Sequence, residues 1–406
     1  MLISELGFGG AEGAFLRLAR ALAKDNEVEL VVFQQHYAVA GYTAAPIEAG
    51  LPVHRLDEGA AGGRVARWRH RAGQLRAVKE RLRPDATISF LSGPNLLNAA
   101  TRGPGLRLVS LRGSRVYDEN SRVSVKTLFR HMLDPITFAG ADGIVSVSEG
   151  VTREAARVRP GAAVPSRFRT ISGYGDAEAL IAAAEAPVEP EWRGIDGQPL
   201  VVAIGRLSVE KGFQHLVRVM AGVRRRIPEA RLLLVGDGPY RAQLEAAAVA
   251  HGLDWSDDPS SDAAILSAGY RSAPLRFARL GKAFAVSSGA EGFPNVLVEA
   301  LAAGVPVVAG DVPWGVREVM GIAADPANRP YPREEPLETP FGWLMPRIDD
   351  ARFGDAWADR LAASLAAQPP SPEAVALARK RVRALDVGHA ARQWSDFIHD
   401  LKRAKG

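Results

Sequence analysis

The sequence of 406 residues contains no cysteine. This absence excludes a disulfide-stabilised scaffold, cysteine-ligated zinc, iron–sulfur clusters and a cysteine nucleophile. The sequence also lacks an uninterrupted apolar run of the roughly 18 residues that a membrane-spanning helix needs. Its first residues are too rich in glycine for the apolar core of a secretory signal. We therefore expect the protein in the cytoplasm.

The composition is that of a folded protein. Apolar residues make up 47% of the chain and charged residues 24%, a balance typical of globular domains and not of a disordered chain. At this length, two domains of roughly 200 residues each are expected, and each is large enough to bury its own core.

The net charge of +5 is distributed unevenly along the chain. Residues 1–175 contain 24 Lys/Arg against 16 Asp/Glu, whereas the remainder contains 27 against 30. Residues 64–83 hold eight of these cations and one acid, Glu80, with apolar residues at helical spacing. This predicts a basic amphipathic helix, either a solvated arginine-rich surface or a patch for anionic lipid headgroups or an anionic acceptor. No aromatic and basic recognition module accompanies it, so we expect no nucleic acid partner.

Short apolar segments alternate with helical periodicity along the chain, a pattern typical of doubly wound α/β sheets. In the first half we expect strands at 2–4, 28–33, 86–91, 106–111 and 143–147, and helices at 12–24, 64–83, 122–138 and 149–158. The alternation restarts with strands at 200–204, 231–235, 263–267, 283–287 and 305–309. Three helices are expected at the end, at 351–367, 372–385 and 388–402.

These patterns predict an α/β fold of two Rossmann-like domains with a C-terminal helical tail. Residues 1–175 form the first domain, and residues 176–199, with a short helix at 177–186, form a linker rich in proline and glycine. Residues 200–385 form the second domain, and residues 386–406 form a helix that packs back on the first. A ligand would lie at the carboxyl ends of both sheets, in a central cleft.

A glycine-rich loop follows the first expected strand. Gly7, Gly9 and Gly10 precede the helix at 12–24, so the backbone can approach a ligand closely and the helix N-terminus can meet a phosphate. The spacing misses the dinucleotide-binding fingerprint by one residue. A tight turn without any ligand would need the same glycines.

Two cations follow the strand at 200–204. Arg206 and Lys211 leave the sheet at its carboxyl edge within one loop, where they could neutralise a diphosphate without a metal. They could equally be ordinary surface cations before a helix.

The strongest motif is the segment Glu291-Gly292-Phe293-Pro294-Asn295-Val296-Leu297-Val298-Glu299. Glu291 follows the strand at 283–287, and Glu299 lies one turn into the helix that Asn295 begins. Two carboxylates placed in this way can hold hydroxyl groups at two points of an extended ligand, whose phosphates would meet the backbone N–H groups of residues 293–295.

Taken in order, these motifs resemble the retaining glycosyltransferases of the GT-B fold, and more narrowly glycosyltransferase family 4 of bacterial lipopolysaccharide, capsule and exopolysaccharide synthesis. The likeness rests on the opening Gly9-Gly10-Ala11-Glu12, the loop from Gly205 to Gly212 and the two acids of 291–299. It extends to Gly236-Asp237-Gly238 and Gly269-Tyr270-Arg271, and covers nearly the whole chain.

The resemblance implies a role for each matching residue. Arg206 and Lys211 would stabilise the departing nucleoside diphosphate, and Glu291 would contact the transferred sugar; these are the implied catalytic residues. The implied donor-binding residues are Glu299 for the ribose, Tyr270 and Arg271 for the base, Gly9 and Gly10 for the phosphates, and Phe293, Pro294 and Asn295 as a source of N–H groups.

The resemblance also implies an activity. The enzyme would transfer a hexosyl group from a nucleotide-sugar donor, with a UDP-sugar favoured, to a saccharide or lipid-linked saccharide, with retention of configuration and by front-face attack. It would use no metal and no cofactor, and the chain has no Asp-x-Asp triplet in a sugar-site context. The enzyme would be cytoplasmic, with peripheral contact to the anionic inner face of the membrane as an option.

Two departures from the family concern the first domain and the hinge. Arg112 stands where many relatives have a histidine, which makes it the candidate on the acceptor side. Gly173-Tyr174-Gly175 replaces a Tyr-Asn-Pro entry to the linker.

The sequence leaves two other functions open. A GT-B sugar-nucleotide epimerase would want further acid and base residues, and the eight histidines form no evident cluster. A non-catalytic nucleotide-sugar-binding subunit would be expected to have lost the cations or the acid pair, which are intact. A dehydrogenase is disfavoured by the missing fingerprint.

Overall fold

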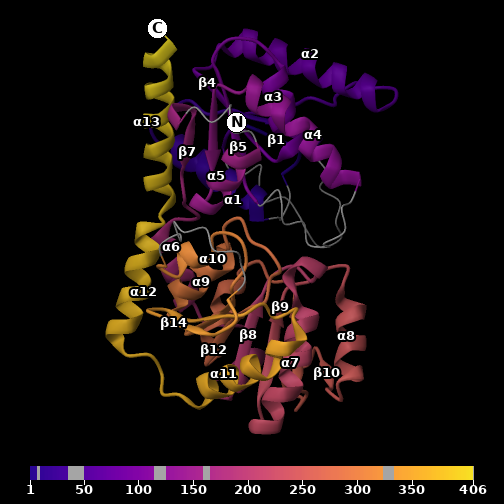
Figure 1. The fold of residues 1–406 in the computed structure, drawn as a ribbon, viewed down its shortest axis with the longest axis vertical. Helices are drawn as coiled ribbons and strands as arrows, with labels where there is room; N and C mark the ends of the chain where they lie inside the picture. Colours follow the sequence, from indigo (N-terminus) through magenta and orange to yellow (C-terminus); the bar gives the residue numbers. More distant parts are fainter. Residues whose placement is uncertain (7–9, 35–49, 114–124, 159–164, 323–332, 406) are drawn as a thin grey trace. The chain divides into compact units, whose positions relative to one another are not determined.

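The computed structural model describes residues 1–6, 10–34, 50–113, 125–158, 165–322 and 333–405. The chain forms two compact units, unit 1 with residues Met1–Asp176 and Leu385–Gly406, and unit 2 with residues Ala177–Ala384 (Figure 1). The chain therefore returns to unit 1 for its last helix.

Unit 1 is built on a parallel sheet of seven strands in the order β3-β2-β1-β4-β5-β6-β7. The first six follow the order of a dinucleotide-binding fold, which reverses between β1 and β4. The strands are β1 (Leu2–Ile3), β2 (Leu30–Val32), β3 (Val53–Arg55), β4 (Ala86–Phe90), β5 (Leu106–Leu111), β6 (Gly143–Ser146) and β7 (Phe168–Thr170).

Helices cover this sheet and bury apolar side chains against it. Phe15 of the first helix meets Phe90 of β4 edge to face, with ring centroids 5.4 Å apart, in the core of the unit. The last helix, α13, lies against α1 (Figure 1). The helices are α1 (Gly10–Leu22), α2 (Arg64–Leu82), α3 (Ser92–Ala100), α4 (Val125–Gly140), α5 (Glu149–Val158) and α13 (Val387–Lys405).

The predicted basic helix exists as α2, but its residues do not form one uniform cationic face. Lys79 is 2% exposed and donates hydrogen bonds of 3.0 Å to Asn98 Oδ1 and the Thr101 carbonyl. Arg71 holds Asp57 through two bonds of 2.5 and 2.6 Å. Trp68 packs against Phe33 in a small apolar cluster of unit 1. The cations that remain exposed are Arg64, Arg67, Arg69, Arg76, Arg81 and Arg83.

Unit 2 has an eight-stranded sheet in the order β10-β11-β9-β8-β12-β13-β15-β14. All neighbours are parallel except β14 and β15, which pair antiparallel at one edge. The strands are β8 (Leu200–Ile204), β9 (Arg231–Val235), β10 (Trp255–Ser256), β11 (Ile265–Gly269), β12 (Ala283–Val286), β13 (Val307–Gly310), β14 (Leu337–Thr339) and β15 (Gly342–Met345).

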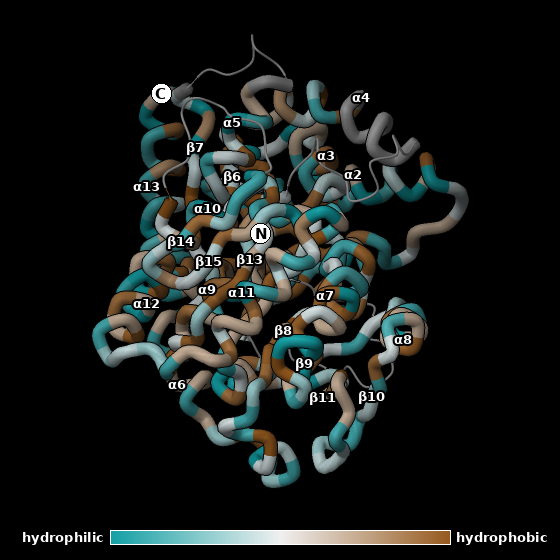
Figure 2. Tube along the Cα trace, turned by 60° about the horizontal axis from the view of Figure 1, so that its bottom comes forward, coloured by the Kyte–Doolittle hydropathy of each residue, from teal (hydrophilic) through white to brown (hydrophobic). Residues whose placement is uncertain are grey.

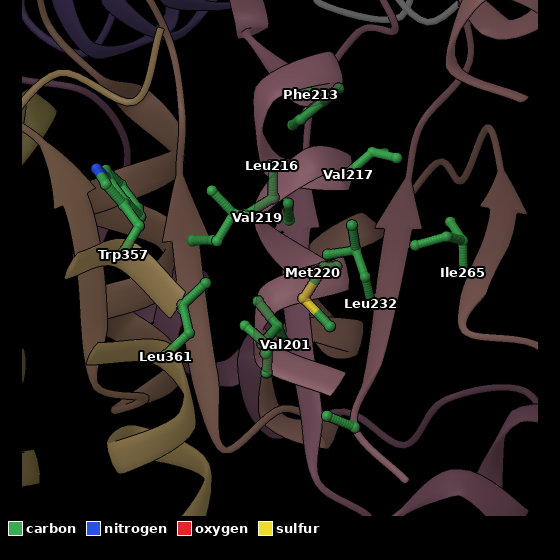
Figure 3. Close-up of a cluster of buried hydrophobic side chains, with 14 of the residues drawn as sticks. Val201, Phe213, Leu216, Val217, Val219, Met220, Leu232, Ile265, Trp357 and Leu361 are labelled. Atoms are coloured by element: carbon green, nitrogen blue, oxygen red, sulfur yellow. The ribbon is translucent and has the colours of Figure 1, made fainter. Parts of the chain in front are cut away.

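The core of unit 2 lies between this sheet and its helices. Figure 3 shows Leu216 and Val219 of α7 next to Trp357 and Leu361 of α11, all almost fully buried. Figure 2 shows hydrophobic residues concentrated along strands such as β8 and β9, as expected for strands covered on both faces. The helices are α6 (Ala177–Glu185), α7 (Phe213–Arg226), α8 (Arg241–Ala250), α9 (Asn295–Ala303), α10 (Val316–Val319), α11 (Gly354–Ala366) and α12 (Pro372–Ala384).

The segment expected as a linker belongs to unit 2. Helix α6 packs against α9 and α12, and a 3₁₀ helix, η3 (Pro190–Ile195), buries Trp192 to 2% exposure against Phe277. A segment rich in proline can therefore pack against a domain when its apolar side chains, such as Trp192, are buried there.

The expected strands and helices are confirmed within the described residues, and the α/β class with them; residues 122–124, at the start of one expected helix, lie outside the described residues. Strands β5, β8 and β9 have the predicted bounds, and the other expected strands differ at their ends by one or two residues. The sequence pattern missed β3, β7, β10, β14 and β15, which are short and lie at or near the sheet edges. Among the helices of the described residues, none is both long and apolar enough to cross a membrane.

Candidate active site

The candidate site lies at the carboxyl edge of the unit 2 sheet, where the strand order reverses. Strand β8 pairs with β9 on one side and with β12 on the other, so the loops that leave β8 and β12 start side by side. In open α/β sheets this reversal is where ligands bind. The two loops carry Arg206 and Lys211, and Glu291, respectively.

Two hydrogen bonds hold these two loops together. The Ser287 hydroxyl donates to the Lys211 carbonyl at 2.8 Å, and the Gly289 N–H donates to the Glu210 carbonyl at 3.0 Å. Gly212, with φ of 66°, follows Lys211. A side chain at Gly212 would overlap the Ser287 carbonyl, so glycine is required there by space and by conformation.

Lys211 and Glu291 form an ion pair at the centre of the site. Lys211 Nζ lies 2.7 Å from Glu291 Oε1, although the residues are 80 positions apart in the sequence. Their side chains are 25% and 11% exposed, so the pair is partly shielded from water but remains reachable. The structure thus brings together two of the three predicted catalytic residues.

Arg206, the third predicted catalytic residue, is exposed in the loop after β8. Its guanidinium makes no hydrogen bond or ion pair with any residue that the structure describes. It is therefore available to an anion that approaches the edge of the sheet, and a guanidinium can hold two oxygens of a phosphate at once.

Helix α9 begins at Asn295, as predicted, and positions the second acid. Glu299 is half-buried in the second turn, while Phe293 is 7% exposed and Pro294 precedes the helix. Pro294 has no N–H, so the expectation that all of residues 293–295 supply donors is wrong at that position and holds at most for Phe293 and Asn295. The N-terminus of the helix still favours negative charge.

Tyr270 and Arg271 follow β11 at the same edge, with β9 between their strand and β8. The Arg271 guanidinium lies 5.8 Å from the rings of Trp192 and of Phe277. Tyr270 is 36% exposed, and partial burial raises the pKa of its phenol. Tyr270 and Arg271 therefore lie farther along the carboxyl edge from Glu291 than Arg206 and Lys211 do. A long ligand bound along this edge could reach both ends.

Three predicted site residues belong to unit 1. Gly10 is the first residue of α1, and Gly9 lies outside the described residues. Arg112 follows β5, and its guanidinium stacks 4.8 Å from the ring centroid of Phe90. Burial, reinforced by the positive charge of Arg17, lowers the pKa of Arg112 to about 10.

Arg17 of α1 is the neighbour that sequence reasoning missed. Its guanidinium stacks 4.1 Å from the ring of Tyr174 and donates to the Tyr174 carbonyl at 2.9 Å. Within the described part of the chain, neither Arg17 nor Arg112 has a carboxylate partner. Two neighbouring guanidiniums without an acid make this edge of unit 1 electropositive.

Sequence reasoning also missed Ser287 and the segment after β13 that contacts Glu291. The Glu291 N–H donates to the Pro313 carbonyl at 2.8 Å, and the Trp314 N–H donates to the Glu291 carbonyl at 2.6 Å. The position of residues 311–317 directly after an expected strand was a usable signal, because that edge collects functional loops. The residues that the structure describes contain no group of three or more His, Asp or Glu side chains that could hold a metal ion.

Residues 198–330 match the family model described as Glycosyl transferases group 1. An uncharacterized glycosyltransferase of Methanocaldococcus jannaschii is 30% identical over 135 residues, which cover 33% of this chain and 31% of the relative. A lipopolysaccharide core biosynthesis glycosyltransferase of Rhizobium meliloti is 24% identical over 74% of this chain and 75% of its own length. The chain spans about a third or less of the first three curated relatives that it matches.

Solved structures resemble the whole chain. Sucrose-phosphate synthase from Thermosynechococcus elongatus superposes with a TM-score of 0.68 at 20% identity, over 99% of this chain and 98% of that one. Anabaena HepE, solved with UDP and glucose, gives 0.66 at 16% identity, over 97% and 98%. The chain therefore has the GT-B fold, as the sequence predicted. Its second unit contains a glycosyl transferases group 1 domain.

Proposed function

We propose that this protein is a glycosyltransferase that moves a hexosyl group from a nucleoside diphosphate sugar to an acceptor hydroxyl. The observation that carries the proposal is the Lys211–Glu291 ion pair, with the exposed guanidinium of Arg206 in the same loop as Lys211, at the strand-order reversal of a group 1 domain. A cation pair and a carboxylate in one place suit a ligand that is anionic at one end and rich in hydroxyl groups at the other.

The charges of the site suggest how the donor binds. Arg206 and Lys211 supply two positive charges for the diphosphate, and Glu291 supplies an acceptor for sugar hydroxyl groups. Lys211 is paired with Glu291 before the donor arrives. The diphosphate would draw the ammonium towards its oxygens, and the released Glu291 oxygen would accept a hydrogen bond from the sugar.

Retention by front-face attack is the stereochemistry we propose. The bond between the anomeric carbon and the phosphate oxygen breaks, and its electron pair goes to the diphosphate, where Arg206 and Lys211 stabilise the new charge. The acceptor oxygen bonds to the same face of the carbon, and its proton passes to the departing phosphate oxygen. This scheme needs no protein base, since Glu291 is occupied with the sugar.

The remaining donor contacts extend along the same sheet edge. We assign Glu299 to the ribose, the segment at Tyr270 and Arg271 to the base, and the N–H groups of Phe293 and Asn295 to the sugar and phosphates. Gly9 and Gly10 would add phosphate contacts from unit 1. A UDP-sugar is the favoured donor, supported by the fold shared with a structure that contains UDP and glucose.

The acceptor is proposed to be a saccharide or a lipid-linked saccharide of cell-surface polysaccharide or glycolipid synthesis. Arg112 and Arg17, which lack acidic partners among the described residues, would suit a phosphate group on such an acceptor. The exposed arginines of α2 would hold a cytoplasmic enzyme on the anionic inner face of the membrane, near a lipid-linked acceptor.

The test is a panel of UDP-, GDP- and ADP-sugars, first by thermal shift and then with candidate acceptors, because a bound donor raises the melting temperature by mass action. The expected result is one nucleotide class that stabilises the protein and supports transfer, with NMR showing the donor configuration kept in the product. Conversion of the donor sugar without acceptor would indicate an epimerase instead. Binding without any turnover would indicate a non-catalytic subunit.

A further inference from the structure

A buried ion pair joins the two ends of the segment that contacts the backbone of Glu291. Asp311 follows β13 and its side chain is fully buried, while that of Arg317, in α10, is 10% exposed. Arg317 Nε and Nη2 donate to the two carboxylate oxygens at 2.7 and 2.6 Å. The Arg333 N–H adds a bond of 3.1 Å to the same carboxylate. The contact is bidentate, and both carboxylate oxygens of Asp311 accept hydrogen bonds.

Stability alone is a poor explanation for this pair. Removing two charges from water costs about as much as their attraction returns, so apolar residues of the same volume often stabilise a fold equally well. A bidentate contact between a guanidinium and a carboxylate fixes the relative orientation of the two side chains. The geometry that it defines here is that of the enclosed segment, residues 312–316.

This segment is the support for the backbone of Glu291. Pro313 and Trp314 exchange two backbone hydrogen bonds with Glu291, of 2.8 and 2.6 Å. Gly315, with φ of 74°, packs so closely that a Cβ there would lie 2.6 Å from the Gly292 carbonyl oxygen. Any change in the path of residues 312–316 is therefore transmitted to the position of Glu291.

We propose that Asp311 and Arg317 are positioning residues that hold Glu291 in register with Lys211. The inference rests on the proposed function for its catalytic consequence, but its structural part concerns two side chains of this chain alone. Without the pair, the segment 312–316 loses its two fixed ends, and the Glu291 carboxylate leaves the Lys211 ammonium. A misplacement of this kind, on the order of 1 Å, can lower a rate by about a hundredfold.

The variants are Arg317→Gln and Asp311→Asn, with Arg231→Gln as the matched control. Arg231 is also a buried arginine of unit 2, 6% exposed, and its Nε donates to the Ala263 carbonyl at 2.9 Å. It begins β9 and so lies at the opposite, amino edge of the same sheet. Its loss should lower stability without displacing Glu291.

The first measurement does not depend on any activity. Lys211 is labelled with an amine-reactive reagent, and its rate is compared by mass spectrometry with that of the exposed Lys282. An ammonium held by a carboxylate reacts slowly, so Arg317→Gln and Asp311→Asn should raise the relative labelling of Lys211 several-fold, while Arg231→Gln leaves it at the wild-type value. Unchanged labelling in both site variants, each shown to be folded, would overturn the proposal.

The second measurement is turnover of the folded variants. Arg317→Gln and Asp311→Asn should lower kcat by roughly tenfold or more with a smaller change in donor KM, because orientation and not affinity is lost. The double variant Asp311→Leu/Arg317→Met should recover stability relative to the single variants but not kcat. Recovery of kcat together with stability would reduce the pair to a structural role. Wild-type protein that neither binds nor transfers any nucleotide sugar would contradict the proposed function, and the labelling result would still decide the inference.

Discussion

Gly212 leaves no space for a side chain next to Ser287, since a Cβ on Gly212 would lie 2.0 Å from the Ser287 carbonyl oxygen. This contact joins the loop after β8 to the end of β12, and it sets Lys211 opposite Glu291. The geometry of the candidate site therefore depends on a residue that has no side chain of its own.

Gly212→Ala should both destabilise the protein and lower its activity. An alanine in the left-handed region costs about 1–2 kcal/mol on its own. The matched control is Gly252→Ala, because Gly252 has φ of 68° and nothing within 4 Å of its Cβ position. Denaturant unfolding should show the backbone cost alone for Gly252→Ala and a clearly larger loss for Gly212→Ala. Equal losses would mean that the contact with Ser287 adds nothing.

Lys211→Ala should lower turnover at least tenfold, which corresponds to roughly 1.4 kcal/mol of transition-state stabilisation. In the proposed mechanism the departing diphosphate would lose one of its two cations, and Glu291 loses its ion-pair partner. Lys282→Ala, an exposed lysine at the opposite end of β12, is the control and should keep wild-type turnover. Initial rates at saturating donor provide the measurement, and wild-type turnover in Lys211→Ala would remove the residue from the mechanism.

Transfer should continue in the presence of EDTA. The cations Arg206 and Lys211 can neutralise a diphosphate, and the described residues contain no cluster of three or more metal-ligating side chains. The measurement is the rate after treatment with EDTA and again after addition of Mg²⁺ or Mn²⁺. Complete loss that either ion restores would reveal a metal requirement and contradict this prediction.

The protein should bind anionic vesicles through the exposed arginines of α2. Each basic residue near an anionic surface contributes about 1 kcal/mol, and salt screens the attraction over about 10 Å at 0.1 M. Arg67→Gln/Arg69→Gln should weaken co-sedimentation with anionic vesicles at low salt. Arg225→Gln/Arg279→Gln, two exposed arginines of unit 2, should not. Recovery in the supernatant with anionic and neutral vesicles alike, at low and at high salt, would make α2 a solvated surface.

The buried Lys79 should make stability depend on pH. Burial lowers its pKa from 10.5 to about 8 in the folded protein, so between these values the unfolded chain binds more protons. Stability relative to Lys79→Met should therefore rise with pH from about 8 to 10.5, by on the order of 1–3 kcal/mol, and stay constant below pH 8. Urea unfolding of wild type and Lys79→Met at pH 7 and pH 10 gives the difference between their free energies of unfolding at each pH. Groups that titrate alike in both proteins do not contribute to this difference. A difference that does not change with pH would mean that Lys79 titrates normally.

Much of the fold was predictable because buried parallel strands are nearly continuous apolar segments. The apolar segments at 106–111, 200–204 and 231–235 are too short for helices and are therefore predicted as buried strands. Their bounds agree with β5, β8 and β9. Edge strands such as β3 and β7 are only partly buried, so their residues need not be apolar and leave little pattern. Arg71 and Lys79 show the same limit for charge, because the pattern of α2 does not reveal which cations have internal partners.

The sequence by itself determined which residues stand at the ends of strands, since local hydrophobic pattern and spacing depend on neighbours along the chain. It thereby placed Arg206 and Lys211 in the loop after one strand, Glu291 in the loop after another, and Glu299 in the helix that follows. Tertiary structure alone decided that Lys211 meets Glu291 and that Asp311 and Arg317 support it from behind. The physical reason is that strands adjacent in a parallel sheet are not adjacent in sequence: β8 lies beside β12, with β9, β10 and β11 between them along the chain. No local pattern records that order, so the partners of the charged residues appear only when the sheet is assembled.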